Sequence, residues 1–186
     1  MSDFDYESRI VSIPDYPEKG VIFKDITPLF ADPEGLVHLV DDIADHFLGR
    51  GITKVVGAEA REVYSQSYSS FLVGAPVAYK LGAGFVPARK PGKLPREVYS
   101  QSYSLEYGTD ELQIHKDALN PDDVVLIVDD LVATGGTAAA TAKLVEQSGA
   151  RIEGFSFILE LTFLNPRDVI AKEYPDREVY TLIPVK

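Results

Sequence analysis

The sequence contains no cysteine, so the chain can form neither a disulfide framework nor a thiolate metal site. It has no apolar run of about eighteen residues, which excludes a transmembrane helix. Positive charge is also scarce: 18 Lys and Arg residues stand against 29 Asp and Glu residues, for a formal net charge of −11. This balance argues against nucleic acid or an anionic membrane as the main partner.

The acidic N-terminal stretch MSDFDYESRI lacks the apolar core of a signal peptide. Secretion is therefore not expected, and together with the lack of cysteine this predicts a cytoplasmic protein. The length of 186 residues favours one domain with a real core. A hydrophobic content of 45% and a charged content of 25% are those of an ordinary globular protein.

The most informative stretch is VVLIVDDLVATGGT, residues 124–137. Its apolar run, 124–128, predicts a buried strand that ends at Asp129 and Asp130. A Gly/Thr loop follows and opens an Ala-rich helix, whose N-terminus attracts a phosphate anion together with the loop amides. The two carboxylates can accept hydrogen bonds from vicinal sugar hydroxyls, directly or around a metal ion. The stretch therefore predicts a sugar-phosphate site, and it matches neither the dinucleotide fingerprint nor the P-loop.

Four basic residues fall close together in the string RKPGKLPR, at Arg89, Lys90, Lys93 and Arg96. A local cationic patch on an acidic chain indicates a small anionic ligand. A solvated basic loop is the alternative interpretation. The surrounding polar stretch, 89–112, lacks a core pattern, and its charge and Gly/Pro content predict a mobile or hairpin-like lid.

Strands and helices alternate along the chain. The pattern predicts strands over 53–58, 85–88, 124–128, 151–161 and 178–183, with a short extended piece at 21–23. It predicts helices over 3–13, 32–49, 71–81, 136–148 and 166–172. Such alternation predicts a mainly parallel sheet with right-handed crossovers, in which ligands bind at the carboxyl ends of the strands.

The stretch 124–137 resembles the phosphoribosyl pyrophosphate (PRPP) binding motif of type I phosphoribosyltransferases. Further strings resemble the adenine phosphoribosyltransferases, in order and over nearly the whole chain: PDYPEKGVIFKDITPLF, VGAEAR, GFVPARKPGKLP, SYSLEYGTDELQIHKDAL and ILELT. The resemblance implies an α/β fold of type I phosphoribosyltransferase kind, with a mainly parallel twisted sheet flanked by helices. It also implies a single domain over 1–186, with a small N-terminal hood (1–32) that binds the base and a flexible lid (89–112).

The resemblance implies a reaction of purine salvage, in which adenine and PRPP give AMP and pyrophosphate. Mg²⁺ is the implied cofactor, held mainly through PRPP with no direct protein ligand, and the implied assembly is a homodimer. A hypoxanthine, guanine or xanthine phosphoribosyltransferase is one alternative, although KGVIFKDIT and SLEYG argue against it. Another alternative is a PRPP-binding sensor, or an engineered or impaired variant that keeps the fold and PRPP binding with reduced catalysis.

The resemblance also implies residue roles. The ribose and the 5′-phosphate of PRPP would contact Asp129, Asp130, Ala133, Thr134, Gly135, Gly136 and Thr137. The pyrophosphate would face Arg61, Arg89, Lys90 and Lys93. The adenine pocket would be lined by Ile22, Phe23 and Lys24, where an Arg is common in place of Lys24. The catalytic acid/base would be Glu106, beside Tyr107 on the lid.

One feature departs from the family pattern: REVYSQSYS, at 61–69, recurs without change at 96–104. The second copy lies in the expected lid. The first is out of place, because residues 62–70 stand where the family has a single Gly after Arg61. We interpret 62–70 as an insertion of a duplicated lid segment. We expect the fold to tolerate it, since loop entropy grows slowly with length, and expect Glu62 to weaken binding on the pyrophosphate side.

Overall fold

A five-stranded parallel sheet forms the centre of the protein, in the strand order β4-β3-β7-β8-β9. The computed structural model describes residues 4–16, 19–59, 69–104 and 108–186. The sheet strands are β3 (Lys54–Ala58), β4 (Gly84–Ala88), β7 (Val124–Val132), β8 (Arg151–Leu161) and β9 (Glu178–Val185). The parallel sheet expected from the alternating pattern is thus confirmed, with β7 as its central strand.

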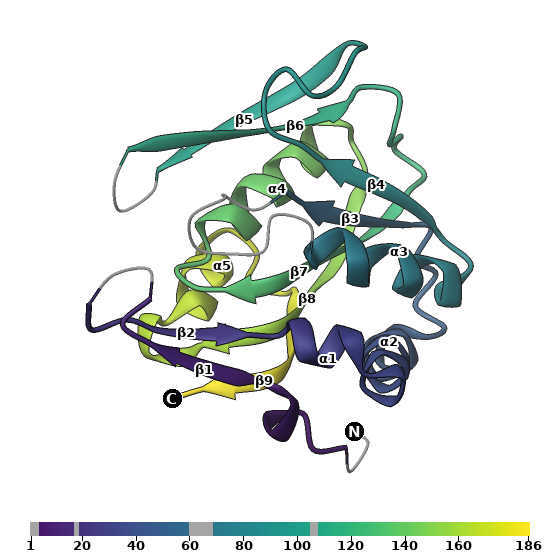
Figure 1. The fold of residues 1–186 in the computed structure, drawn as a ribbon. Helices are drawn as coiled ribbons and strands as arrows, with labels where there is room; N and C mark the ends of the chain where they lie inside the picture. The colour runs from purple at the N-terminus through teal and green to yellow at the C-terminus, as the bar shows by residue number, and fades with distance from the viewer. Residues whose placement is uncertain (1–3, 17–18, 60–68, 105–107) are drawn as a thin grey trace.

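Helices cover both faces of this sheet (Figure 1). They are α1 (Thr27–Ala31), α2 (Pro33–Phe47), α3 (Ser69–Leu81), α4 (Gly136–Gln147) and α5 (Pro166–Glu173). Side chains of α1, α2 and α3 pack with Leu126 and Val128 of β7, whereas α4 and α5 pack with Val125 and Ile127. Because successive side chains of a strand point to opposite faces, one apolar run supplies both core layers.

Two antiparallel hairpins lie outside the main sheet. One joins β1 (Val11–Pro14) to β2 (Ile22–Asp25), and the other joins β5 (Val98–Ser104) to β6 (Thr109–His115). Short 3₁₀ turns occur at Glu7–Arg9 and Thr162–Leu164. In Figure 1 the β5–β6 hairpin lies above the sheet and the β1–β2 hairpin below it, and both extend toward the side to which β3 and β7 point.

The expected helix over 3–13 is wrong. The structure has a single 3₁₀ turn there, followed by β1, whose Val11 and Ile13 pair with Asp25 and Phe23. A helix of that length has little stability of its own. The β-branched residues of this stretch fit the hairpin better. Helix α1 was not predicted, because the Pro-, Gly- and Asp-rich stretch around it was interpreted as turns.

The stretch 89–112 forms part of a hairpin, which is one of the two forms predicted for it, a mobile or a hairpin-like lid. The interpretation that it lacks a core pattern is wrong at its end, because Leu112 and Ile114 of β6 are fully buried. They belong to the same core layer as α4. The hairpin therefore has an apolar face held against the body of the protein. Within the described ranges, none of the helices has the length and apolar character that crossing a membrane requires.

Gly74 of α3 packs against Phe85 of β4 with no space for a side chain. A Cβ atom on Gly74 would lie 2.7 Å from Phe85 Cε2. Alanine is normally the better helix former by about 1 kcal/mol. Here we expect Gly74→Ala to lower the free energy of unfolding by about 1–3 kcal/mol, because the ring must move. Urea unfolding followed by circular dichroism measures this change.

The matched control is Gly74→Ala in a Phe85→Leu background, where the overlap is relieved. In that background the penalty of the alanine should shrink. A Gly74→Ala variant at least as stable as the parent protein would contradict the packing.

Candidate active site

A pair of adjacent carboxylates, Asp129 and Asp130, lies near the carboxyl end of the central strand. The side chains are only 5% exposed each. Strand β7 continues to Val132, beyond the expected end at 128, and Asp129 still pairs with Phe157 of β8. The two acids are therefore part of the sheet rather than of the loop after it, and neighbouring strands screen them from water.

Burial perturbs the ionisation of both acids. It raises the pKa of Asp129 well above the ordinary value, and the neighbouring charge of Asp130 raises it further. Burial also raises the pKa of Asp130, while a hydrogen bond from the Ser69 hydroxyl lowers it in part. The positive charge of Lys90 acts on Asp129 in the same downward sense. Such a pair favours hydrogen-bond donors or a cation as a ligand.

The Gly/Thr loop, residues 133–137, leads from β7 into α4. Gly135 is the N-cap of α4 and adopts a left-handed conformation, with φ of +88°. A Cβ atom there would lie 3.0 Å from the carbonyl oxygen of Pro166. Glycine is thus required both by the backbone angle and by the close approach of α5. The first turn of α4 contains no acidic side chain, so its N–H groups favour an anion.

Three of the predicted pyrophosphate residues form a basic cluster: Arg89, Lys90 and Lys93. Arg89 Nε and Lys93 Nζ both donate to the Glu59 carboxylate, at 3.0 Å for Arg89. Lys90 Nζ donates to Asp110 and, at 3.2 Å, to the Tyr103 hydroxyl. Each cation of the cluster therefore has a carboxylate partner.

Arg96, the fourth residue of the basic string, does not join this cluster. It pairs with Asp117, and both side chains are more than half exposed. The basic loop is thus divided: its first three cations bind the buried or half-buried carboxylates Glu59 and Asp110, and the last forms an ordinary surface ion pair.

Sequence reasoning missed two carboxylates of the site, Glu59 and Asp110. Burial raises the pKa of each, but the hydrogen bonds and positive charges around it together lower the pKa below the ordinary value. A signal for Glu59 was available, since it directly follows the buried strand β3, much as Asp129 follows the apolar run of β7.

Residues of the expected adenine pocket lie on β2. Phe23 is half-buried, and its ring contacts that of Tyr16 edge-on at 5.3 Å between centroids. Lys24 Nζ donates to the Ser12 hydroxyl at 2.8 Å. Ile22 is 62% exposed. The hairpin thus presents apolar surface to its surroundings rather than to the main core.

Arg61, Glu106 and Tyr107 lie outside the described residues, as does most of the inserted stretch 62–70. Its last two residues are described and begin α3. Ser69 Oγ donates to Asp130, and Ser70 Oγ donates to the carbonyl oxygen of Ala58. The described residues include both α3 and the five-stranded sheet. The expectation that the fold tolerates the insertion stays a prediction.

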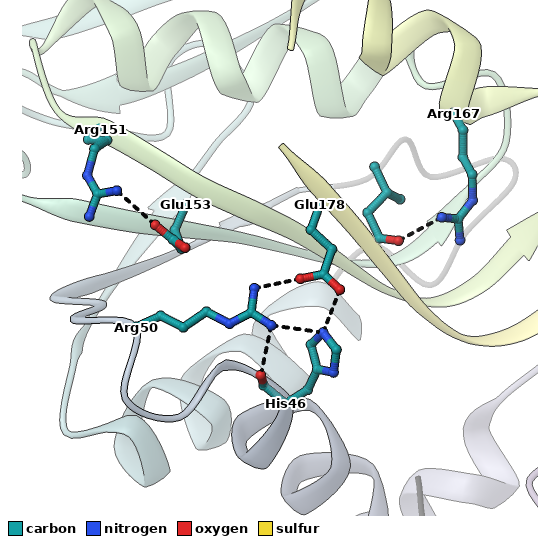
Figure 2. A network of polar contacts seen from close by, with 7 residues as sticks. His46, Arg50, Arg151, Glu153, Arg167 and Glu178 are labelled. Carbon is teal, nitrogen blue, oxygen red and sulfur yellow. Dashed lines mark hydrogen bonds and ion pairs between the residues drawn. The ribbon is translucent and has the colours of Figure 1, made fainter. Parts of the chain in front are cut away.

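A second polar network lies away from these residues and joins α2 to β9 (Figure 2). Glu178 binds both Arg50 and His46, at 2.8 Å from His46 Nε2. The His46 ring stacks on Tyr180 at 3.9 Å between centroids. Nearby, a cleft of about 840 Å³ is lined by residues of β8, β9 and α5, and by neither the carboxylate pair nor the basic cluster. This network attaches the edge strand β9 to the body of the protein.

Comparisons with known proteins agree with this geometry. The adenine phosphoribosyltransferase of Alkaliphilus metalliredigens (strain QYMF) is 53% identical over 164 residues, which cover 88% of this chain and 92% of that protein. The crystal structure of the Thermoanaerobacter pseudethanolicus enzyme is similar with a TM-score of 0.85 at 46% identity, covering 97% of this chain and 98% of that one.

The adenine phosphoribosyltransferase of Saccharomyces cerevisiae was crystallised with D-2,5-dideoxy-2,5-imino-altritol 1,6-bisphosphate and adenine. Its structure has a TM-score of 0.84 at 37% identity, covering 95% of this chain and 96% of that one. No protein-family model matches the chain.

The parallel sheet, with its carboxylate pair and Gly/Thr loop at the carboxyl end, defines the class: this is a type I phosphoribosyltransferase fold. The similarity of sequence and structure goes further. The chain belongs to the adenine phosphoribosyltransferase family and is a glycosyltransferase. The alternatives of a different phosphoribosyltransferase or an impaired variant are not favoured by this similarity.

The buried charge of Asp129 leads to a prediction about stability. Its pKa is raised in the folded state, so the ionised carboxyl destabilises the fold as pH rises from the unfolded-state pKa, about 4, through the folded-state pKa. We expect Asp129→Asn to raise the free energy of unfolding by about 1 kcal/mol at about pH 7. This gain should vanish at about pH 2, well below both pKa values, where the carboxyl is protonated in both states.

Urea unfolding at the two pH values measures the effect. The matched control is Asp122→Asn, in the exposed turn that precedes β7, where we expect a change below about 0.5 kcal/mol. Loss of stability at neutral pH in Asp129→Asn would show that the carboxylate is well accommodated.

Proposed function

We propose that the chain transfers the phosphoribosyl group of PRPP to adenine, giving AMP and pyrophosphate, within one domain over 1–186. The observation that carries the proposal is the carboxylate pair beside the Gly/Thr loop. Asp129 and Asp130 accept hydrogen bonds from the ribose hydroxyls, and the amides of 133–137 hold the 5′-phosphate. A bound bisphosphate analogue and adenine in the related yeast enzyme support this assignment.

The basic cluster suits the leaving group. Displacing pyrophosphate from C1 of ribose builds positive charge on the sugar and negative charge on the departing oxygens. Cations placed in advance stabilise those oxygens without reorganisation. Arg89, Lys90 and Lys93 supply such charges, and the resemblance adds Arg61 to them.

Mg²⁺ fits the donor set of the site. Asp129 and Asp130 offer hard oxygen ligands, and burial raises the pKa of both because a buried carboxylate is unfavourable without a cation. Magnesium is usually bound through one or two carboxylates together with substrate phosphates. When bound, the ion neutralises charge on the pyrophosphate. We propose that it is held mainly through PRPP, with the carboxylate pair nearby.

Adenine is proposed to bind against the hood, residues 1–32. Ile22 and Phe23 offer apolar surface to the flat base, and backbone groups beside Lys24 read its edge. Glu106, beside Tyr107, is proposed to move the purine proton. The lid 89–112, which includes β5 and the start of β6, is proposed to exclude water from the reactive sugar. A homodimer and a cytoplasmic location complete the proposal, on the strength of the family resemblance and the absence of cysteine.

A direct assay tests the proposed reaction. We expect the purified protein to form AMP from adenine and PRPP in the presence of Mg²⁺, and to lose this activity with a chelator. Hypoxanthine, guanine and xanthine should compete poorly with adenine. Asp130→Asn should lower kcat/KM for PRPP by about a hundredfold or more, since a charged acceptor of the ribose is lost.

Asp122→Asn, in the turn that precedes β7 and so beyond the opposite end of the strand, should leave the rate unchanged. Absence of AMP, or faster turnover of another base, would refute the assignment of adenine.

The inserted stretch 62–70 touches the site through Ser69, which donates to Asp130. We expect replacement of 62–70 by a single glycine to raise kcat/KM for PRPP several-fold, because a competing donor and the carboxylate of Glu62 are removed together. The value for adenine should change little. Steady-state kinetics with each substrate varied in turn measures both, and equal kcat/KM values for PRPP would contradict the expectation.

A further inference from the structure

Glu59 is a buried carboxylate to which the mechanism above assigns no role. It directly follows β3, and its side chain is only 2% exposed. Its backbone N–H donates to the carbonyl oxygen of Ala88 at 2.8 Å, which continues the pairing of β3 with β4. Glu59 is thus anchored by the sheet itself.

Three donors from one short segment, 89–93, converge on this carboxylate. Arg89 Nε lies 3.0 Å from Glu59 Oε2, the backbone N–H of Lys90 lies 2.9 Å from the same oxygen, and Lys93 Nζ binds Oε1. Burial raises the pKa of Glu59, but the hydrogen bonds from Lys93, Lys90 and Arg89 together lower it below the ordinary value. The carboxylate is therefore ionised at neutral pH.

The manner in which Arg89 is held matters for an incoming anion. Its guanidinium uses Nε toward Glu59, while within the described residues neither Nη atom makes a hydrogen bond. Its backbone is paired in both directions with Gln113, at 2.8 Å each, and its Cζ lies 5.8 Å from the centre of the Phe71 ring. An arginine held by Nε keeps its two Nη donors for a phosphate, which it can bind in bidentate fashion.

We propose that Glu59 is a positioning residue, which holds Arg89 and Lys93 in place for the pyrophosphate group before PRPP binds. The inference rests on the proposed role of these two cations at the pyrophosphate. Glu59 lies behind the cations, so deeply buried that it does not reach the ligand. A substrate anion arriving from the open side meets donors that are already oriented, and less conformational freedom is lost on binding.

Glu59→Gln tests this role, because it keeps the shape of the side chain and removes its charge. We expect the Kd of pyrophosphate with Mg²⁺ and the KM for PRPP to rise about tenfold or more, since two cations lose their shared anchor. Binding of AMP, which uses the Gly/Thr loop and the carboxylate pair, should change less than about twofold. If Glu59 had a merely structural role, Glu59→Gln would weaken the binding of pyrophosphate and of AMP together.

Two further variants complete the experiment. Glu59→Asp keeps the charge on a shorter stem and should give an intermediate loss, so it carries the test if the glutamine variant does not fold. Glu173→Gln, on the surface of α5 where it pairs with Lys143, is the matched control and should leave both ligands unaffected.

Arg89→Ala separates this inference from the proposed function. If it weakens pyrophosphate binding and Glu59→Gln does too, with AMP retained, the positioning role is supported. If Arg89→Ala weakens binding but Glu59→Gln leaves it unchanged or makes it tighter, Glu59 is not a positioning residue, and tighter binding identifies it as a competing anion. If Arg89→Ala has no effect, the assignment of the pyrophosphate site and the inference both fail.

Discussion

Asp129 and Asp130 are acids buried side by side in the central strand of the sheet, and the surrounding residues are arranged around their charge. Burial of two adjacent carboxylates without a cation is unfavourable, which is why their pKa values are raised. The protein offsets this only in part, through the Ser69 hydroxyl and the nearby charge of Lys90. The remaining deficit favours hydrogen-bond donors or a cation at this site, which is the basis of the proposed contacts with sugar hydroxyls and Mg²⁺.

Charges of alternating sign extend outward from this pair. Lys90 lies close enough to act on Asp129 and is itself bound by Asp110, while Arg89 and Lys93 share Glu59. Each cation is thus oriented by an acid from another segment, either Glu59 directly after β3 or Asp110 in β6. Such support keeps donors in position in the absence of ligand, as electrostatic stabilisation of a departing pyrophosphate requires. The same arrangement concentrates charge in a small buried volume. The charges that favour ligand binding therefore lower the free energy of unfolding of the unliganded protein.

The stretch 62–70, which we interpret as a duplicated segment, lies between β3 and α3 in the sequence. Residues 62–70 enlarge this connection, yet α3 still packs Gly74 against Phe85 and places Val73 and Val77 in the core. A longer loop costs little entropy, whereas the apolar contacts of α3 are independent of it. The described end of the stretch 62–70 contacts the site through Ser69, which donates to Asp130.

Much of this protein could be predicted from the sequence alone, because the signals are local. The strand at Arg151–Leu161 and the start of α2 after Asp32 follow from apolar runs and from a Pro at the first helical position. The motif from Val124 onward predicts a sugar-phosphate site without any distant residue, since its strand, acids and loop are consecutive in the sequence.

Contacts between distant residues were decided by the tertiary structure. The N-terminal stretch became a hairpin because β2 was available to pair with it, and Leu112 and Ile114 became core because α4 lies beneath them. Glu59 has no periodic signature, and its role arises only where the end of β3 meets the segment after β4. The sequence by itself indicated the class of site and the succession of strands and helices along the chain, since both depend on residues that are close in sequence. The tertiary structure decided which acid holds which cation, because only the pairing of strands brings those charges within hydrogen-bond distance.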